Sequence, residues 1–280
     1  MRIRYGFRLA LDCAQPTPAT FMVDIHPSRA RDVVMQTPLQ CRPHVPMTTQ
    51  DDLFGNIVRR AVLPVGRSVI EVDGIVRDSG EPDPINRAAR QTPVAALPAE
   101  AMPYLLGSRY CETDLLGYEA WRLFGSAPEG WARVQAICDY VHERIRFGYA
   151  DADRTRTAAG AHEQRRGVCR DFAHLAIAFC RAMNIPARYC TGYLGDIGVP
   201  RDPAPMDFSA WFEAYLDGHW YSFDARHNIP RIGRVVIARG RDATDVAIVN
   251  TFGPHILSGF EVWTDELEDE DAQPQRERAA

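Results

Sequence analysis

The sequence predicts an α+β protein, in which a β-rich N-terminal region precedes a region of helices and antiparallel strands. Short alternating or apolar runs, separated by Pro, Gly and Asp, fill residues 1–95, as strands and turns would. From about residue 113, apolar residues recur at intervals of three and four, the spacing of amphipathic helices. Alternating runs return over residues 187–225, so we expect a helix layer packed on an antiparallel sheet.

In the N-terminal region, residues 20–25 and 68–76 have the composition of strands. The segment DLFGN at residues 52–56 is predicted to form a turn that leads into a strand over residues 57–63. Residues 81–98 are rich in Pro and Ala and have no clear period, which is typical of a linker.

These patterns predict three parts of the chain. We expect a β-rich domain with its linker over residues 1–95 and a core domain over residues 96–264. Residues 265–280 are highly charged and almost without apolar side chains, which indicates a disordered tail.

Two helices are predicted in the core. Trp131, Val134, Ile137, Val141 and Ile145 lie on one face of the first. The second is expected over residues 169–183, with an apolar stripe before Pro186; the stripe comprises Ala173, Ala176, Ile177 and Cys180.

Composition disfavours several classes of function. The net charge is −5, which argues against nucleic acid as a general partner. No run approaches 18 apolar residues, so no membrane span is expected, and the Arg-containing start at residues 1–11 lacks the pattern of a signal peptide. All 32 basic residues are Arg, so the chain offers no lysine side-chain amine for cross-linking to itself.

The cysteines predict free thiols. The sequence has seven, irregularly spaced, with no CxxC and no Cys/His cluster of zinc-binding spacing. We therefore expect a reducing, cytoplasmic location and mostly buried structural thiols. Neither a metal nor an organic cofactor is implied by the functional interpretation given below.

The segment GVCRDF at residues 167–172 is the first strong functional signal. Gly167 permits a close approach, and Cys169 then opens the second helix. Unpaired amides and the helix dipole at this position favour a thiolate, which predicts a lowered thiol pKa. The same amides could bind the oxyanion formed during acyl transfer. The alternative is one more buried structural thiol.

The second signal is a hairpin over residues 208–224. Asp217 and Gly218 form a two-residue turn between alternating runs. This register pairs Trp211 with Asp224 and places both on the same face as Ser209, with Ser209 diagonal to Asp224 at roughly 7–8 Å.

Together, residues 167–188 and 209–228 resemble the core of the transglutaminase-like superfamily, and the turn at residues 52–56 resembles the β-rich N-terminal region of bacterial members. The resemblance implies a papain-like core and a Cys–His–Asp triad. The Cys falls on Cys169 and the Asp on Asp224. The family His falls on position 209, where this chain has Ser209.

Serine cannot act as a general base near neutral pH, so we weighed other histidines. His227, three residues beyond Asp224, is a possible substitute base. His219 lies too far along the hairpin, and His174 is expected to be a hydrogen-bonded core residue. Trp211 and Gly167 are expected to line the pocket. A basic cluster, which comprises Arg231, Arg234, Arg239 and Arg241, is read as a solvated loop, with an anion subsite as the alternative.

The resemblance implies a cysteine enzyme that acts on peptide or amide bonds through a Cys169 thiolate, as a peptidase, amidase or deamidase. Its partner would be a peptide or protein substrate. The alternative is a catalytically inactive relative that binds peptide in the same cleft, and Ser209 is the feature that favours it.

Overall fold

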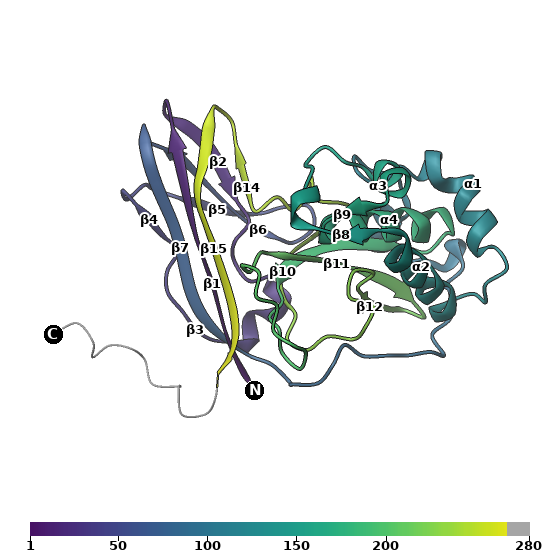
Figure 1. The fold of residues 1–280 in the computed structure, drawn as a ribbon. Helices are drawn as coiled ribbons and strands as arrows, with labels where there is room; N and C mark the ends of the chain where they lie inside the picture. The colour runs from purple at the N-terminus through teal and green to yellow at the C-terminus, as the bar shows by residue number, and fades with distance from the viewer. Residues whose placement is uncertain (268–280) are drawn as a thin grey trace.

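The computed structural model describes residues 1–267. It has a β-rich part and a part in which helices cover one face of a sheet (Figure 1). Within the described residues, none of the helices is both long enough and apolar enough to cross a membrane.

The N-terminal region forms two antiparallel sheets. Its strands are β1 (Arg2–Cys13), β2 (Thr17–Phe21), β3 (Val33–Gln36), β4 (Gln40–Arg42), β5 (Thr48–Asp51), β6 (Ile57–Leu63) and β7 (Gly66–Arg77), with a 3-10 helix η1 at Pro27–Asp32. The predicted turn at residues 52–56 joins β5 to β6 as expected. Large apolar side chains of β1 and β7 are fully buried between the layers, among them Phe7 and Ile70.

The C-terminal end of the described chain returns to this region. Strand β14 (Val249–Thr251) pairs with β2, and the long strand β15 (His255–Leu267) pairs with β1 along its whole length (Figure 1). The sheets run in the orders β15-β1-β7-β3, with β4 also on β7, and β14-β2-β6-β5.

This return corrects the predicted boundaries. Residues 255–264, which we assigned to the core domain, belong to the N-terminal sheet. Residues 265–267, which we assigned to a disordered tail, are also strand: Asp265 pairs with Arg4 and Leu267 with Arg2. The charged side chains misled the prediction because an edge strand keeps one side in water. The rest of the predicted tail, 268–280, lies outside the described residues.

The core region supplies the helices. They are α1 (Thr113–Phe124), α2 (Trp131–Arg144), α3 (Ala158–Gln164) and α4 (Cys169–Ala182), with short 3-10 helices η2 (Val94–Ala96), η3 (Ala99–Leu105) and η4 (Tyr149–Asp151). Its strands are β8 (Arg146–Phe147), β9 (Arg166–Gly167), β10 (Ala187–Tyr193), β11 (Ser209–Leu216), β12 (His219–Phe223) and β13 (Val235–Gly240). The main sheet runs β12-β11-β10-β13, and α4 packs on β10 and β11.

Alternation along β11 gives this sheet two buried faces. Ala210, Phe212 and Ala214 belong to the large apolar cluster that packs under α4. Trp211 lies on the other face, where the Glu213 carboxylate is paired with arginines. A strand buried on both faces needs its charged residues paired, and these are.

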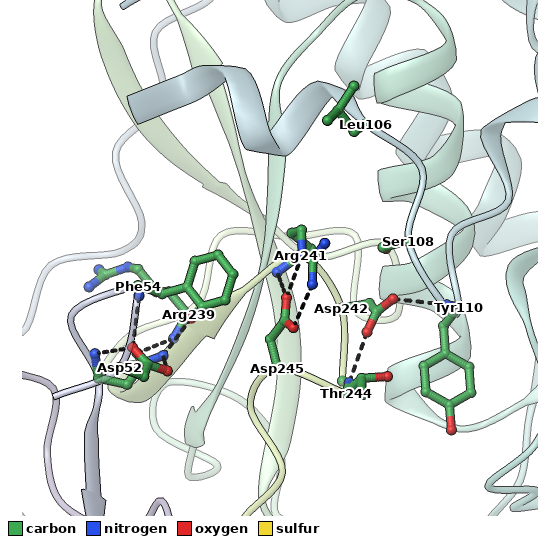
Figure 2. A network of polar contacts seen from close by, with 12 residues as sticks. Asp52, Phe54, Leu106, Ser108, Tyr110, Arg239, Arg241, Asp242, Thr244 and Asp245 are labelled. Atoms are coloured by element: carbon green, nitrogen blue, oxygen red, sulfur yellow. Dashed lines mark hydrogen bonds and ion pairs between the residues drawn. The ribbon is translucent and has the colours of Figure 1, made fainter. Parts of the chain in front are cut away.

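The turn at residues 52–56 links the two regions (Figure 2). The Asp52 carboxylate accepts hydrogen bonds from the amides of Phe54 and Asn56 at 2.8 and 2.9 Å. The Asn56 side chain then bonds to both the backbone oxygen and the backbone nitrogen of Arg239 on β13, at 2.7 and 2.8 Å. The turn therefore binds the core sheet much as a strand partner would.

Candidate active site

Cys169 is the first residue of α4, and Val168 is its N-cap. The helix has 14 residues, about four turns, as predicted. Cys169 is half-buried, whereas the other six cysteines are buried. It is thus the cysteine best placed to meet a substrate.

Buried polar contacts fix the first turn of α4. The Asp171 carboxylate accepts from the Val168 amide at 2.8 Å and from the Arg156 guanidinium at 3.2 Å. A Cβ at Gly167 would lie 2.5 Å from this carboxylate, so glycine is needed to admit it. Gly167 therefore positions the helix start; it is not among the residues that line the cavity at Cys169, where we had expected it.

A cavity of about 760 Å³ opens at Cys169. Its walls come from the start of α4, the connection between β10 and β11, the start of β11 and the segment after β12. The residues that matter for chemistry are Asp153, Cys169, Arg170, Asp207, Ser209, Ala210, Arg226 and His227. This volume suits part of a peptide or a small molecule.

Ser209 lines this cavity as the first residue of β11. The backbone amide of the next residue, Ala210, favours the thiolate of Cys169 and so lowers its pKa. Trp211 does not line the cavity, contrary to our expectation. It is buried on the opposite face of the sheet, 5.1 Å from the Arg234 guanidinium.

Asp224 and His227 form a pair at the cavity. The His227 Nδ1 lies 2.8 Å from the Asp224 carboxylate, whose other oxygen accepts from the amides of Arg226 and His227 at 3.0 and 3.1 Å. The Arg234 guanidinium donates to the same Asp224 oxygen that contacts His227, at 3.1 Å. With Nδ1–H donating to Asp224, the Nε2 of His227 is left free to accept a proton.

The charge of this pair is set by its surroundings. Burial opposes ionisation of Asp224, but the charge of Arg234 and the hydrogen bonds from His227 outweigh it and hold the pKa of Asp224 below its ordinary value. Asp224 is buried, whereas the side chain of His227 is 25% exposed and lines the cavity. The Asp224 carboxylate is thus placed to orient the imidazole of His227, and the imidazole is partly exposed at the cavity.

The Cys169 thiol has a raised pKa, so the predicted lowering is wrong. Burial raises its pKa to about 11, and the Asp207 and Asp224 charges add to the rise. The charge of Arg226 and the backbone amide of Ala210 oppose this rise without overcoming it. The resting thiol is therefore protonated at neutral pH and needs a base to react.

The two other histidines considered from the sequence, His219 and His174, lie where the sequence placed them. His219 is exposed at the hairpin turn and bonds to the Asp217 carbonyl. His174 is fully buried, stacked on Tyr110 at 5.0 Å, and its Nε2 accepts from the Ala243 amide at 3.1 Å. Burial keeps the pKa of His174 well below its ordinary value.

The arginines of the basic cluster face carboxylates and do not form a free anion subsite, and only Arg241 is exposed to solvent as expected. Arg234 pairs with Asp83 and Asp224, Arg239 with Glu213, and Arg241 with Asp245; Arg231 is buried, 3.7 Å from Asp196. Sequence reasoning therefore missed Arg234 as a support of Asp224. Its position directly before the apolar run that opens β13 could have signalled burial.

Sequence reasoning also gave no role to Arg226, which lines the cavity, or to His142, whose Nδ1 bonds to the Arg226 carbonyl oxygen. Their one local signal was the position of Arg226 between Asp224 and His227.

In the described residues, no group of three or more His, Cys, Asp or Glu side chains could hold a metal ion.

Comparison with known proteins supports the fold class. Residues 122–225 match the model of the Transglutaminase-like superfamily. A crystal structure from Cytophaga hutchinsonii, described as a candidate cysteine protease, has a TM-score of 0.82 and 29% identity, covering 96% of this chain and 91% of that one. An uncharacterised Mycobacterium leprae protein is 37% identical over 94 residues, 31% of this chain, and this chain spans only 32% of its length.

The chain is therefore an α+β protein with a transglutaminase-like core domain and a β-rich N-terminal region, as the sequence predicted. Its similarities support a transglutaminase-like enzyme in general terms.

Proposed function

We propose that the protein is a cysteine enzyme that acts on amide bonds of peptides or proteins, as a peptidase, amidase or deamidase. Cys169 is the nucleophile, and His227, oriented by Asp224, is the base in place of a histidine at position 209. The observation that carries the proposal is the 2.8 Å contact between His227 and Asp224 at the cavity that also exposes Cys169.

The proposed reaction follows from these positions. The Cys169 sulfur attacks the carbonyl carbon while its proton passes to Nε2 of His227. The first amides of α4, which have no acceptor within the helix, would hold the oxyanion. The C–N bond then breaks, the amine leaves with the proton from His227, and water or another acceptor releases the acyl group.

Asp224 holds the useful tautomer of His227 and stabilises the imidazolium that forms during attack. Arg234 keeps Asp224 ionised, and Asp83 in turn balances Arg234 at 2.8 Å. Asp83 lies in the predicted linker, so the contacts that hold His227 in place extend beyond the core.

We also propose a cytoplasmic location, as expected from the cysteines.

The second candidate is an inactive relative that binds peptide in the same cavity. Two observations favour it: Ser209 stands at the position of the family histidine, and the pKa of Cys169 is raised to about 11. Both features would be harmless in a protein that only binds.

The test is turnover of casein, measured both as released peptides and as released ammonia. We expect wild type to produce one of these products and Cys169→Ala to lose at least about a hundredfold of the rate. Cys41→Ala, a buried cysteine of β4 outside the cavity, is the matched control and should keep the activity. Equal rates in wild type and Cys169→Ala would refute the enzyme; casein bound but unchanged would favour the second candidate.

A further inference from the structure

Arg226 is a half-buried arginine in the cavity wall without an acidic partner. Within the part of the chain that the structure describes, its guanidinium has no carboxylate within ion-pair distance and no hydrogen bond. Comparable arginines nearby do have partners: Arg156 pairs with Asp171, and Arg234 with Asp224. A half-buried guanidinium left open to a cavity is a site for an anion from outside.

The position of Arg226 is fixed from three sides. Its amide donates to the Asp224 carboxylate at 3.0 Å, and its carbonyl oxygen accepts from Nδ1 of His142 at 2.9 Å. Its guanidinium lies over the Phe147 ring, 3.7 Å from the centroid. A stacked guanidinium loses little freedom when it binds a carboxylate, so this residue is preorganised for that task.

Arg170 lies in the same cavity and directly follows Cys169. Its guanidinium bonds to the backbone carbonyl of Asp153 and lies 5.8 Å from the Tyr110 ring, and no acidic side chain among the described residues pairs with it. Arg226 and Arg170 therefore both line the cavity that holds the nucleophile without an acidic partner, and the exposed Arg154 lines it as well.

Among the described residues, none of the acidic side chains that line the cavity forms an ion pair with Arg226 or Arg170; Asp196 lies 3.7 Å from Arg231. The carboxylates of Asp153, Asp196 and Asp202 each accept a backbone amide of a nearby loop residue. Asp207 remains; it interacts with both Arg226 and Cys169 through space, without an ion pair to either. It is the internal competitor for Arg226.

We propose that Arg226, with Arg170, binds a carboxylate that the substrate carries close to the amide attacked by Cys169. The substrate class is then acidic peptides, with the carboxylate on a side chain or at a chain end a few bonds from the reacting carbonyl. The inference rests on the proposed function for its substrate, but the anion site itself can be tested without turnover.

The test compares alkylation of Cys169 by iodoacetate and by iodoacetamide, two reagents of similar size that differ in one negative charge. Mass spectrometry follows the modification, with Cys169→Ala as the blank. Wild type should favour iodoacetate more than free glutathione does. Arg226→Gln should lower the ratio of the two rates by about tenfold, the effect of losing one charge-assisted contact.

Three variants sharpen the result. Arg122→Gln, an exposed arginine of α1, should leave the ratio unchanged. Arg226→Lys keeps the charge and should stay closer to wild type than Arg226→Gln, which separates recognition from a folding defect. Asp207→Asn removes the competitor and should raise the ratio.

A wild-type ratio no higher than that of glutathione, or an unchanged ratio in Arg226→Gln, would overturn the anion site. Preference for iodoacetate in a protein that never alters an amide would leave the anion site standing and count against the proposed function.

Discussion

At the scale of single residues, the proposed base lies away from position 209, where the resemblance to the transglutaminase-like superfamily places a histidine. Ser209 lines the same cavity as Cys169 but offers only a hydroxyl. His227 lines the same cavity and has the carboxylate partner that a base requires. Because the Cys169 thiol has a pKa of about 11, the helix N-terminus alone does not activate it. Under the proposed function, His227 therefore activates the Cys169 thiol.

The sequence pointed to Cys169 and Asp224 because both stand in local motifs, a Gly-X-Cys before a helix and the end of a hairpin, and the resemblance proposed their roles. It offered His227 only as a possible substitute, since a residue four positions past a strand can point either way. What turns it toward Asp224 is the tight loop in which the carboxylate bonds two consecutive amides. The raised thiol pKa could not be predicted, because it depends on burial under segments distant in sequence.

At the scale of elements, turn chemistry and apolar period determined most of the core. Asp217 and Gly218 have φ of 49° and 84°, the values of the predicted two-residue turn, and Leu216 pairs with His219 as expected. Helix α4 begins at Cys169 as the stripe predicted. These features depend on neighbours in sequence, so pattern alone could predict them.

The start of α4 gives a prediction at this scale. In Gly167→Ala, the new Cβ would lie 2.5 Å from the Asp171 carboxylate, which Val168 and Arg156 hold in place. We expect a loss of about 1–3 kcal/mol in the free energy of unfolding, measured with urea, together with a changed rate of Cys169 alkylation.

Gly117→Ala on α1 is the control, because nothing lies within 4 Å of its new Cβ. It should stabilise the protein by about 0.5–1 kcal/mol, as alanine does inside a helix. Equal stability of Gly167→Ala and wild type would show that the first turn of α4 is not held as tightly as described.

At the scale of the whole molecule, the two regions share one apolar cluster, which includes Phe7 of β1 and Phe212 of β11. Strand β15 returns from the core to β1, and the Asn56 side chain binds β13. The sequence did not predict this return, because strand pairing over some 250 residues leaves no local pattern. It predicted the order of the elements but not which distant strands would pair.

The buried His174 makes stability depend on pH. Its folded pKa is lowered by burial, so the folded state keeps it neutral while the unfolded chain takes up a proton below about pH 6.5. Its contribution is therefore complete above pH 6.5 and is lost as the pH falls. Between pH 7.5 and 5, wild type should lose about 2 kcal/mol more stability than His174→Gln, measured by urea unfolding.

His219→Gln changes an exposed histidine in the hairpin and serves as the control. It should lose as much stability as wild type over the same range. If His174→Gln also follows the wild-type pH curve, then His174 is protonated in the folded protein and its assignment as a neutral core residue is wrong.

We propose that His227, and not residue 209, is the general base for Cys169. The most direct measurement is the rate at which p-nitrophenyl acetate acylates Cys169 at pH 7, read as the burst of p-nitrophenolate. Acetyl transfer to the thiol releases the phenolate without needing an acid, so the rate reports the base alone. We predict that His227→Ala lowers this rate by about 10²–10⁴-fold, the usual worth of a general base, and that Ser209→Ala stays near wild type. An unchanged burst in His227→Ala, or an equal loss in Ser209→Ala, would contradict the account.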